Sequence, residues 1–273
     1  MNSPLEITRG IYEKSANLAY FDLCGIKSLY KNRRIPNETK SIKIFKSLLI
    51  DFDDEFTNYF KKETKDCFNI NIYADSIIIC QRPQARINNF FERMVDFFLL
   101  YQFLLFQNRI ISRALLDRDS FFYFHVKSAP PDSILSSQMT NISLCGGKGL
   151  AVMDEILKGL PLGVYVSKNI IKELSANQRR RILKVQCSHL FFIRQEKQKA
   201  QNMLHHHLSE PLLGSLLKKS QKGKKTLNPT EEDIVSFLKK SGFKDEEIKK
   251  SAPWFLVNLG IRKTIEREHE KKT

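Results

Sequence analysis

Two aspartates, Asp22 and Asp75, stand at the ends of short apolar segments. Asp22 follows Ala19-Tyr20-Phe21 and precedes Leu-Cys-Gly, and Asp75 interrupts two β-branched runs at Tyr73-Ala74-Asp75-Ser76. A carboxylate in such surroundings is costly unless a cation or hydrogen bonds compensate its charge. Two carboxylates brought to one edge of a sheet are a recurring way to hold a divalent cation over a triphosphate. The alternative is that each aspartate only stabilises a turn.

Two further features of the sequence could bind phosphate. Gly25 permits a tight backbone, so the amides of Gly25, Ile26, Lys27 and Ser28 could surround phosphate oxygens. Arg113 lies in an apolar run, where an arginine either contacts a phosphate or pairs with a carboxylate. If the two aspartates form a site, we predict that both features bind the nucleotide.

The elements that must position these residues follow from periodicity. Apolar residues at helical spacing predict helices over 42–60, 87–105 and 150–157, and Ser167 is expected to cap a helix over 168–174. β-Branched and alternating residues predict strands at 19–24, a hairpin over 68–80, two strands (109–116 and 121–126) around a polar turn at 117–120, and a strand at 162–166. This order predicts an α/β (α+β) fold, with the βαββαβ arrangement of a ferredoxin-like or palm-type sheet.

Composition shifts divide the chain into four predicted segments. Residues 1–17 are an N-terminal extension, 18–175 the palm, 176–225 a basic helix and linker, and 226–273 a small helical appendage. The appendage begins with a capping-box-like pattern at Thr230 and contains the single tryptophan, Trp254. A unit of that size is marginal alone, so we expect it to dock on the palm.

The net charge of +15 is concentrated in the C-terminal part. Residues 176–273 hold 22 Lys and Arg against 11 Asp and Glu, a balance of +11. This region is therefore a candidate surface for nucleic acid or another anion, or simply a solvated basic surface. The five cysteines form no Cys-x-x-Cys pair, and no segment has the length of a membrane span or the pattern of a signal peptide. We expect a cytoplasmic protein without a membrane partner.

An ordered set of motifs is similar to class III nucleotide cyclases. Asp22-x-x-Gly-Ile-x-x-Leu29 resembles their first metal motif, and Tyr73-Ala-Asp-Ser-Ile-Ile-Ile79 resembles their second metal hairpin, in a form associated with bacterial antiphage pyrimidine cyclases. Ile111-Ser-Arg-Ala-Leu115, Gly147-Lys-Gly-Leu150 and Pro161-Leu-Gly-Val-Tyr-Val-Ser167 resemble three later motifs of that family. The resemblance covers about 155 residues in the family's order.

The resemblance implies a metal-dependent enzyme acting on a nucleoside triphosphate. Asp22, Asp75 and the Leu23 carbonyl would bind Mg²⁺ or Mn²⁺, and the backbone of residues 25–28 would hold the β- and γ-phosphates. The products would be a 3′,5′-cyclic nucleotide and pyrophosphate, and the active form a homodimer.

This sequence departs from the purine cyclases at three positions. Asn71 stands where they have a base-reading lysine, and Ala151 and Glu155 stand where they have a transition-state Asn and Arg. The resemblance therefore points away from adenylate and guanylate cyclases of the usual type. Three readings stay open: a cyclase, a cyclase-like fold that only binds nucleic acid or protein, and a palm-type enzyme that joins nucleotides.

Overall fold

The structure, a computed structural model, describes ten stretches of the chain: residues 6–24, 38–61, 67–73, 75–82, 85, 87–107, 110–128, 142–186, 189–201 and 229–266. The strands in these stretches are β1 (Glu6–Cys24), β2 (Phe68–Tyr73), β3 (Ser76–Gln81), β4 (Ile111–Ser128), β5 (Ile142–Gly146), β6 (Gly163–Ser167), β7 (Ile182–Lys184) and β8 (Leu190–Ile193). The helices are α2 (Glu38–Phe60), α4 (Phe90–Gln107), α5 (Lys148–Lys158), the 3₁₀ turn η2 (Lys168–Glu173), α6 (Ala176–Arg180), α9 (Glu231–Lys240) and α10 (Asp245–Asn258). The predicted α+β class is confirmed.

The sheet has the strand order expected of a βαββαβ unit. In the described chain the strands run β2-β3-β1-β4-β6-β8-β7, and β5 adds to β4. The first four are antiparallel neighbours, and β6 joins β4 in parallel. Since β1, α2, β2, β3, α4 and β4 follow in that chain order, β2-β3-β1-β4 is the ferredoxin-like arrangement. The predicted hairpin over 68–80 is β2 and β3.

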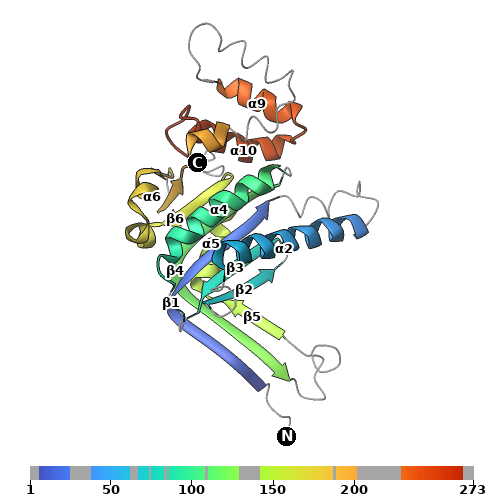
Figure 1. The fold of residues 1–273 in the computed structure, drawn as a ribbon, viewed down its shortest axis with the longest axis vertical. Helices are drawn as coiled ribbons and strands as arrows, with labels where there is room; N and C mark the ends of the chain where they lie inside the picture. The colour runs from blue at the N-terminus through green and yellow to red at the C-terminus, as the bar shows by residue number, and fades with distance from the viewer. Residues whose placement is uncertain are drawn as a thin grey trace, which may run out of the picture.

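Helices cover both faces of this sheet. α2 and α4 lie across one face (Figure 1), where their phenylalanines pack on Ala19, Phe21 and Leu23 of β1. Phe21 stacks on Phe98 with ring centroids 5.0 Å apart. α5 packs on the other face through Met153 and Leu157, against Leu18 and Tyr20. Alternate residues of β1 thus enter different cores, as the two-residue period of a strand requires.

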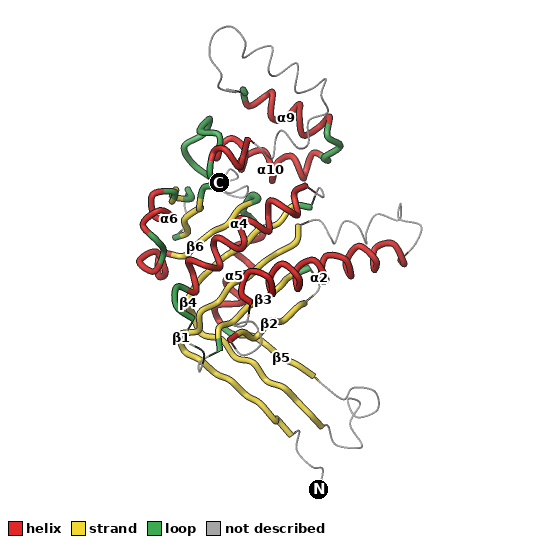
Figure 2. The backbone as a smooth tube through the Cα atoms, in the orientation of Figure 1, coloured by secondary structure: helices red, strands yellow, loops and turns green. Residues whose placement is uncertain are grey.

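Two strands are longer than the sequence indicates. β1 begins at Glu6, within the predicted N-terminal extension, and β4 runs unbroken through the segment expected to be a polar turn at 117–120. The turn prediction was wrong because Asp117, Arg118 and Asp119 pair with β1, and polar side chains in this segment find partners there. Asp117, for example, accepts a hydrogen bond from the Ser167 hydroxyl. Beyond this point β1, β4 and β5 continue as a narrow ribbon past the helices (Figure 2).

Ser167 therefore has a different role from the one predicted. It stands at the N-cap of η2, but its side chain makes no capping hydrogen bond and donates to Asp117 instead. Thr230, in contrast, caps α9 in a capping box with Asp233, as its sequence pattern predicts.

The C-terminal helices dock on the same face of the sheet as α5. Phe237, Phe243 and Phe255 belong to the core that also contains Leu115 and Tyr165. The Leu162 amide donates to the Lys250 carbonyl at 2.9 Å, and the Gln195 amide donates to the Asn258 side chain. The appendage is thus fixed by apolar packing and by backbone hydrogen bonds. No helix in the described ranges is long and apolar enough to cross a membrane.

Gly147, at the start of α5, is expected to tolerate no side chain. Its φ is 135°, and a Cβ there would lie 2.4 Å from the Ser120 carbonyl oxygen and 2.9 Å from the Phe121 Cα. Both contacts are with backbone atoms of β4, which cannot move aside. Gly147→Ala should therefore destabilise the protein by about 2–3 kcal/mol. Chemical denaturation measures this, with Ala151→Gly on the exposed side of α5 as a control near 1 kcal/mol; an unchanged midpoint for Gly147→Ala would contradict the close packing.

Candidate active site at the end of β1

The two predicted metal aspartates lie at the same end of neighbouring strands. Asp22 is opposite Ser76 in the β1–β3 pairing, and Asp75 is in the turn just before Ser76. The Leu23 amide donates to the Asp75 carbonyl oxygen at 2.8 Å, which holds the two segments together. Asp75 is only 8% exposed. The backbone thus brings Asp22, Leu23 and Asp75 together at one edge of the sheet.

The residues around Asp22 form two rows across one face of the sheet. Directly paired positions on adjacent strands share a face. The row at the strand ends is made of Ser76, Asp22, Arg113 and Gly163. The row behind it is made of Asn71, Ile78, Tyr20, Leu115 and Tyr165. The site therefore has polar residues at the edge and a largely apolar floor.

Arg113 is the charged group in direct contact with Asp22. Its Nε donates to Asp22 Oδ2 at 3.1 Å, and its Nη2 donates to the same oxygen. The side chains of Arg113 and Asp22 are 6% and 15% exposed. Nη1 donates to the carbonyls of Leu157 and Leu160, at the C-terminal end of α5, where a cation also complements the helix dipole. Arg113 therefore joins β1, β4 and α5 in one buried network.

Sequence reasoning missed a hydroxyl network beside this ion pair. The Tyr20 hydroxyl lies 2.7 Å from Ser76 Oγ and donates to Asp154 Oδ1 at 3.0 Å. Asp154, on α5, also pairs with Lys158 one turn later. Burial raises the pKa of Tyr20, so its hydroxyl stays protonated near neutral pH. Tyr20 could have been found from its position two residues before Asp22, on the same face of the strand.

Asn71 carries a buried donor without a protein acceptor. Its Nδ2 atom makes no hydrogen bond within the described residues, and it lies in the second row, on the face that Tyr20 occupies. Buried amide groups are rarely left unpaired in native proteins. Asn71 therefore has an unused hydrogen-bonding group next to the candidate site, at the position where the resemblance places a base-reading residue.

The C-terminal appendage adds positive charge at this end of the sheet. Lys250 is joined through its carbonyl to Leu162, and the next residue, Gly163, pairs with Arg113. Burial raises the pKa of the Cys24 thiol to about 12, while the charges of Arg113 and Lys250 act to lower it. The protonated thiol points to Asp22 Oδ2 at 3.7 Å. Cys24 is thus a weak donor to Asp22 rather than a thiolate.

The donor set suits a hard divalent cation. Carboxylate and carbonyl oxygens are the ligands that Mg²⁺ and Mn²⁺ prefer, and Asp22, Asp75 and Leu23 supply them. No group of three or more His, Cys, Asp or Glu side chains converges among the described residues. One oxygen of Asp22 is already bound by Arg113, so a cation would have to share this carboxylate or displace the guanidinium. The predicted phosphate-binding residues Gly25, Ile26, Lys27 and Ser28 lie outside the described residues.

Comparisons with solved structures find catalytic domains of guanylyl cyclases. The catalytic core of a rhodopsin-guanylyl cyclase with converted specificity, in complex with ATPαS, is 8% identical with a TM-score of 0.50, over 68% of this chain and 98% of that one. The guanylate cyclase domain of RhGC from Catenaria anguillulae, in complex with GTP, is 7% identical with a TM-score of 0.49, over 67% and 97%. The guanylyl cyclase Cya2 is 10% identical with a TM-score of 0.47, over 67% and 92%.

At these identities the likeness is one of fold. Nearly the whole rhodopsin-guanylyl cyclase core, 98% of it, has the same architecture as 68% of this chain. No family model and no curated protein matches the sequence. The palm-type fold predicted from the sequence is therefore that of a cyclase catalytic core.

Proposed function

We infer that this protein is a metal-dependent nucleotide cyclase, which converts a nucleoside triphosphate to a 3′,5′-cyclic nucleotide and pyrophosphate. The observation that carries the proposal is the joining of Asp22 and Asp75 by the Leu23–Asp75 backbone hydrogen bond, at the end of β1. The shared fold of a guanylyl cyclase core supports it. Fold alone does not determine chemistry, so the proposal depends on these residues.

Each residue of the site has a defined part in this proposal. Asp22, Asp75 and the Leu23 carbonyl would hold Mg²⁺ or Mn²⁺, which would supply a lowered pKa of the ribose hydroxyl and a positive charge to offset the triphosphate. Arg113 orients Asp22, and we propose that its guanidinium also donates to a phosphate oxygen. Lys250 favours an anionic substrate at this end of the sheet. By the resemblance, the backbone of Gly25, Ile26, Lys27 and Ser28 would contact the β- and γ-phosphates.

Asn71 stands where the resemblance places the base-reading lysine of purine cyclases, which supports a substrate base other than theirs, and we propose a pyrimidine. Its carboxamide offers both a donor and an acceptor, and Nδ2 has no hydrogen-bond partner among the described residues. A single amide can therefore pair with the neighbouring donor and acceptor on the edge of a pyrimidine. By the resemblance, such an enzyme works as a homodimer in antiphage signalling. We further propose a cytoplasmic location, from the cysteine pattern, and a surface for nucleic acid on the C-terminal part, from its basic charge.

The function is tested by incubating the protein with ATP, GTP, CTP or UTP and either Mg²⁺ or Mn²⁺. Mass spectrometry of the products should detect a cyclic pyrimidine nucleotide. Asp22→Asn and Asp75→Asn should each reduce its formation at least about 100-fold, because each removes a charge that offsets charge in the transition state. Asp51→Asn, on the exposed side of α2, is the matched control and should leave the rate unchanged.

Two results would contradict the cyclase proposal. One is the absence of a cyclic product with all four nucleotides in both metals, from protein that sedimentation velocity shows to be dimeric. The other is product formation that neither aspartate substitution reduces. A linear dinucleotide or oligonucleotide product would instead identify a palm-type enzyme that joins nucleotides.

A second function is favoured by the Arg113–Asp22 contact. A guanidinium on the metal-binding carboxylate offsets its charge without any metal. This arrangement suits a cyclase-like fold that has lost catalysis and binds nucleic acid or protein through its basic C-terminal part. For such a module, single-stranded RNA binding should depend steeply on salt, and neither aspartate substitution should change it.

A further inference from the structure

A polar pocket lies where β1 continues past the end of β3. The two strands pair from Asp22 opposite Ser76 to Leu18 opposite Cys80, and β3 ends one residue later at Gln81. Beyond that point no described strand pairs with this edge of β1, and the pairing of β1 with β4 shifts register between Glu13 and Ala16. The cavity left there measures about 320 Å³, near the lower end of the usual range for small-molecule sites. Its lining residues are Glu13, Ser15, Asn17, Gln81, Arg82, Ala85 and Arg118.

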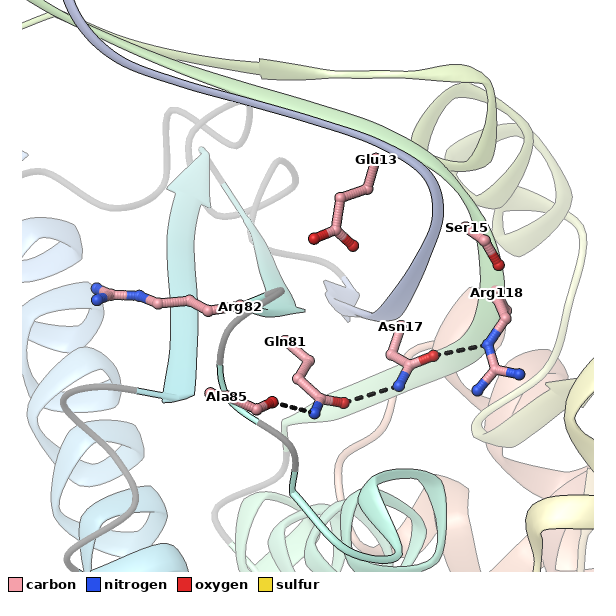
Figure 3. Close-up of a pocket in the computed structure, with 7 residues that line it drawn as sticks. All are labelled: Glu13, Ser15, Asn17, Gln81, Arg82, Ala85 and Arg118. Carbon is pink, nitrogen blue, oxygen red and sulfur yellow. Dashed lines mark hydrogen bonds between the residues drawn. The ribbon is translucent and has the colours of Figure 1, made fainter.

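One wall of this pocket is a chain of hydrogen bonds running in a single direction. Arg118 Nε donates to Asn17 Oδ1, Asn17 Nδ2 donates to Gln81 Oε1, and Gln81 Nε2 donates to the Ala85 carbonyl (Figure 3). The first two distances are both 2.7 Å. The two amide groups are fixed in orientation because each has a partner on both sides.

The two arginines of the lining do not give the pocket a positive character. The Arg118 guanidinium forms an ion pair with Glu173. The Arg82 side chain points away from the cavity (Figure 3), and its Nε donates to the Phe68 carbonyl and to Asn69. The charge of Arg118 is thus offset by Glu173, and the charge of Arg82 is directed away from the cavity.

Glu13, in contrast to the two arginines, directs its charged group into the pocket. Its carboxylate points into the hollow in Figure 3, and its Oε1 atom is buried without a hydrogen-bond partner among the described residues. Burial raises the pKa of this carboxyl above its usual value. A buried carboxylate oxygen without a donor is costly, and a ligand that supplies one removes that cost.

We propose that this pocket binds a small organic cation through a planar guanidinium or amidinium group that donates to Glu13. A planar group with two parallel N–H donors matches a carboxylate, and the Ser15 hydroxyl at the rim offers another acceptor. A divalent metal ion suits the pocket less, because Glu13 supplies the one carboxylate among its described lining residues. A phosphate would meet that carboxylate as a like charge.

This site is separate from the candidate active site. Glu13 precedes Asp22 by nine residues of one strand, on the order of 30 Å at about 3.3 Å per residue. The proposal therefore does not depend on the cyclase proposal, and a ligand here would act on the base of the ribbon formed by β1 and β4.

The test titrates the full chain with methylguanidinium, with tetramethylammonium (a charge without N–H donors) and with urea (donors without a charge). Chemical-shift perturbation should give a Kd on the order of 1 mM for methylguanidinium, and at least tenfold weaker binding for the other two. Glu13→Gln, which keeps the shape and removes the charge, should weaken methylguanidinium binding at least tenfold. Glu232→Gln, on the exposed face of α9, is the control and should not change it.

Ser15→Trp tests the site without changing its charge. The indole should obstruct the rim and also abolish binding, because Ser15 is exposed there and has room for a larger side chain without disturbing the core. The proposal is overturned if the wild-type protein does not bind methylguanidinium, if Glu13→Gln binds it as tightly as the wild type, or if tetramethylammonium binds equally well. Thermal melting of each variant confirms that the chains compared are folded.

Discussion

Replacing Arg113 with leucine is expected to cost about 3–5 kcal/mol of folding free energy, the usual penalty for breaking a buried ion pair from one side. The leucine leaves the Asp22 carboxylate without its cation in surroundings where its side chain is only 15% exposed. It also leaves the carbonyls of Leu157 and Leu160 without their donor. Urea denaturation followed by circular dichroism measures the loss, with the slope of the transition compared between variants.

Two further variants separate the causes of this loss. Asp22→Asn in the Arg113→Leu background should recover part of the stability, because it removes the uncompensated charge. Arg262→Gln is the matched control: its ion pair with Glu231 is 38% and 49% exposed, so the cost should stay below about 1 kcal/mol. A loss of less than 1 kcal/mol for Arg113→Leu would contradict the buried network.

The same variant distinguishes a metal site from a structural ion pair. If Asp22 and Asp75 bind Mn²⁺, the cation can take the place of the missing guanidinium. Mn²⁺ should then raise the melting temperature of Arg113→Leu more than that of the wild type. If Mn²⁺ raises the melting temperature of both proteins equally, or of neither, the result would favour a cyclase-like fold that has lost catalysis.

The parts of the site that are local in the chain could be predicted from the sequence. Asp22 and Asp75 stand within strong β patterns, so their strands and the hairpin could be predicted, and the chain order of elements specified the sheet. The Arg113–Asp22 contact joins residues 91 positions apart, and neither residue indicates which partner it has. Sequence reasoning favoured a carboxylate over a phosphate as the partner of Arg113, but it could not say which carboxylate.

Errors in the predicted strands have a common physical origin. Residues 6–17 and 117–120 are polar, and a single-sequence pattern reads such segments as loops. In the structure, residues 6–17 of β1 pair with residues 118–128 of β4, and Asp117 pairs with Leu18, so tertiary pairing overrides the local preference. The pocket at Glu13 depends on this pairing and on the end of β3, and no local sequence signal contains both.

The largest expected effect outside the site concerns the docking of the C-terminal helices. Phe106, at the end of α4, is fully buried, and its ring lies 5.3 Å from the rings of both Phe243 and Phe255. Phe106→Ala should cost about 3–5 kcal/mol, since it removes an aromatic side chain and leaves a cavity between α4 and the appendage. Differential scanning calorimetry measures the loss.

The calorimetric trace also shows whether the appendage unfolds with the palm. The helices α9 and α10 share one core with β4, β6 and β8, so we expect a single transition in the wild type. Phe103→Ala, one turn earlier and only partly buried, is the matched control and should cost less. If Phe106→Ala lowers only a separate low-temperature transition and leaves the main one in place, the appendage is an independent unit and the charge of Lys250 at the candidate site depends on its docking.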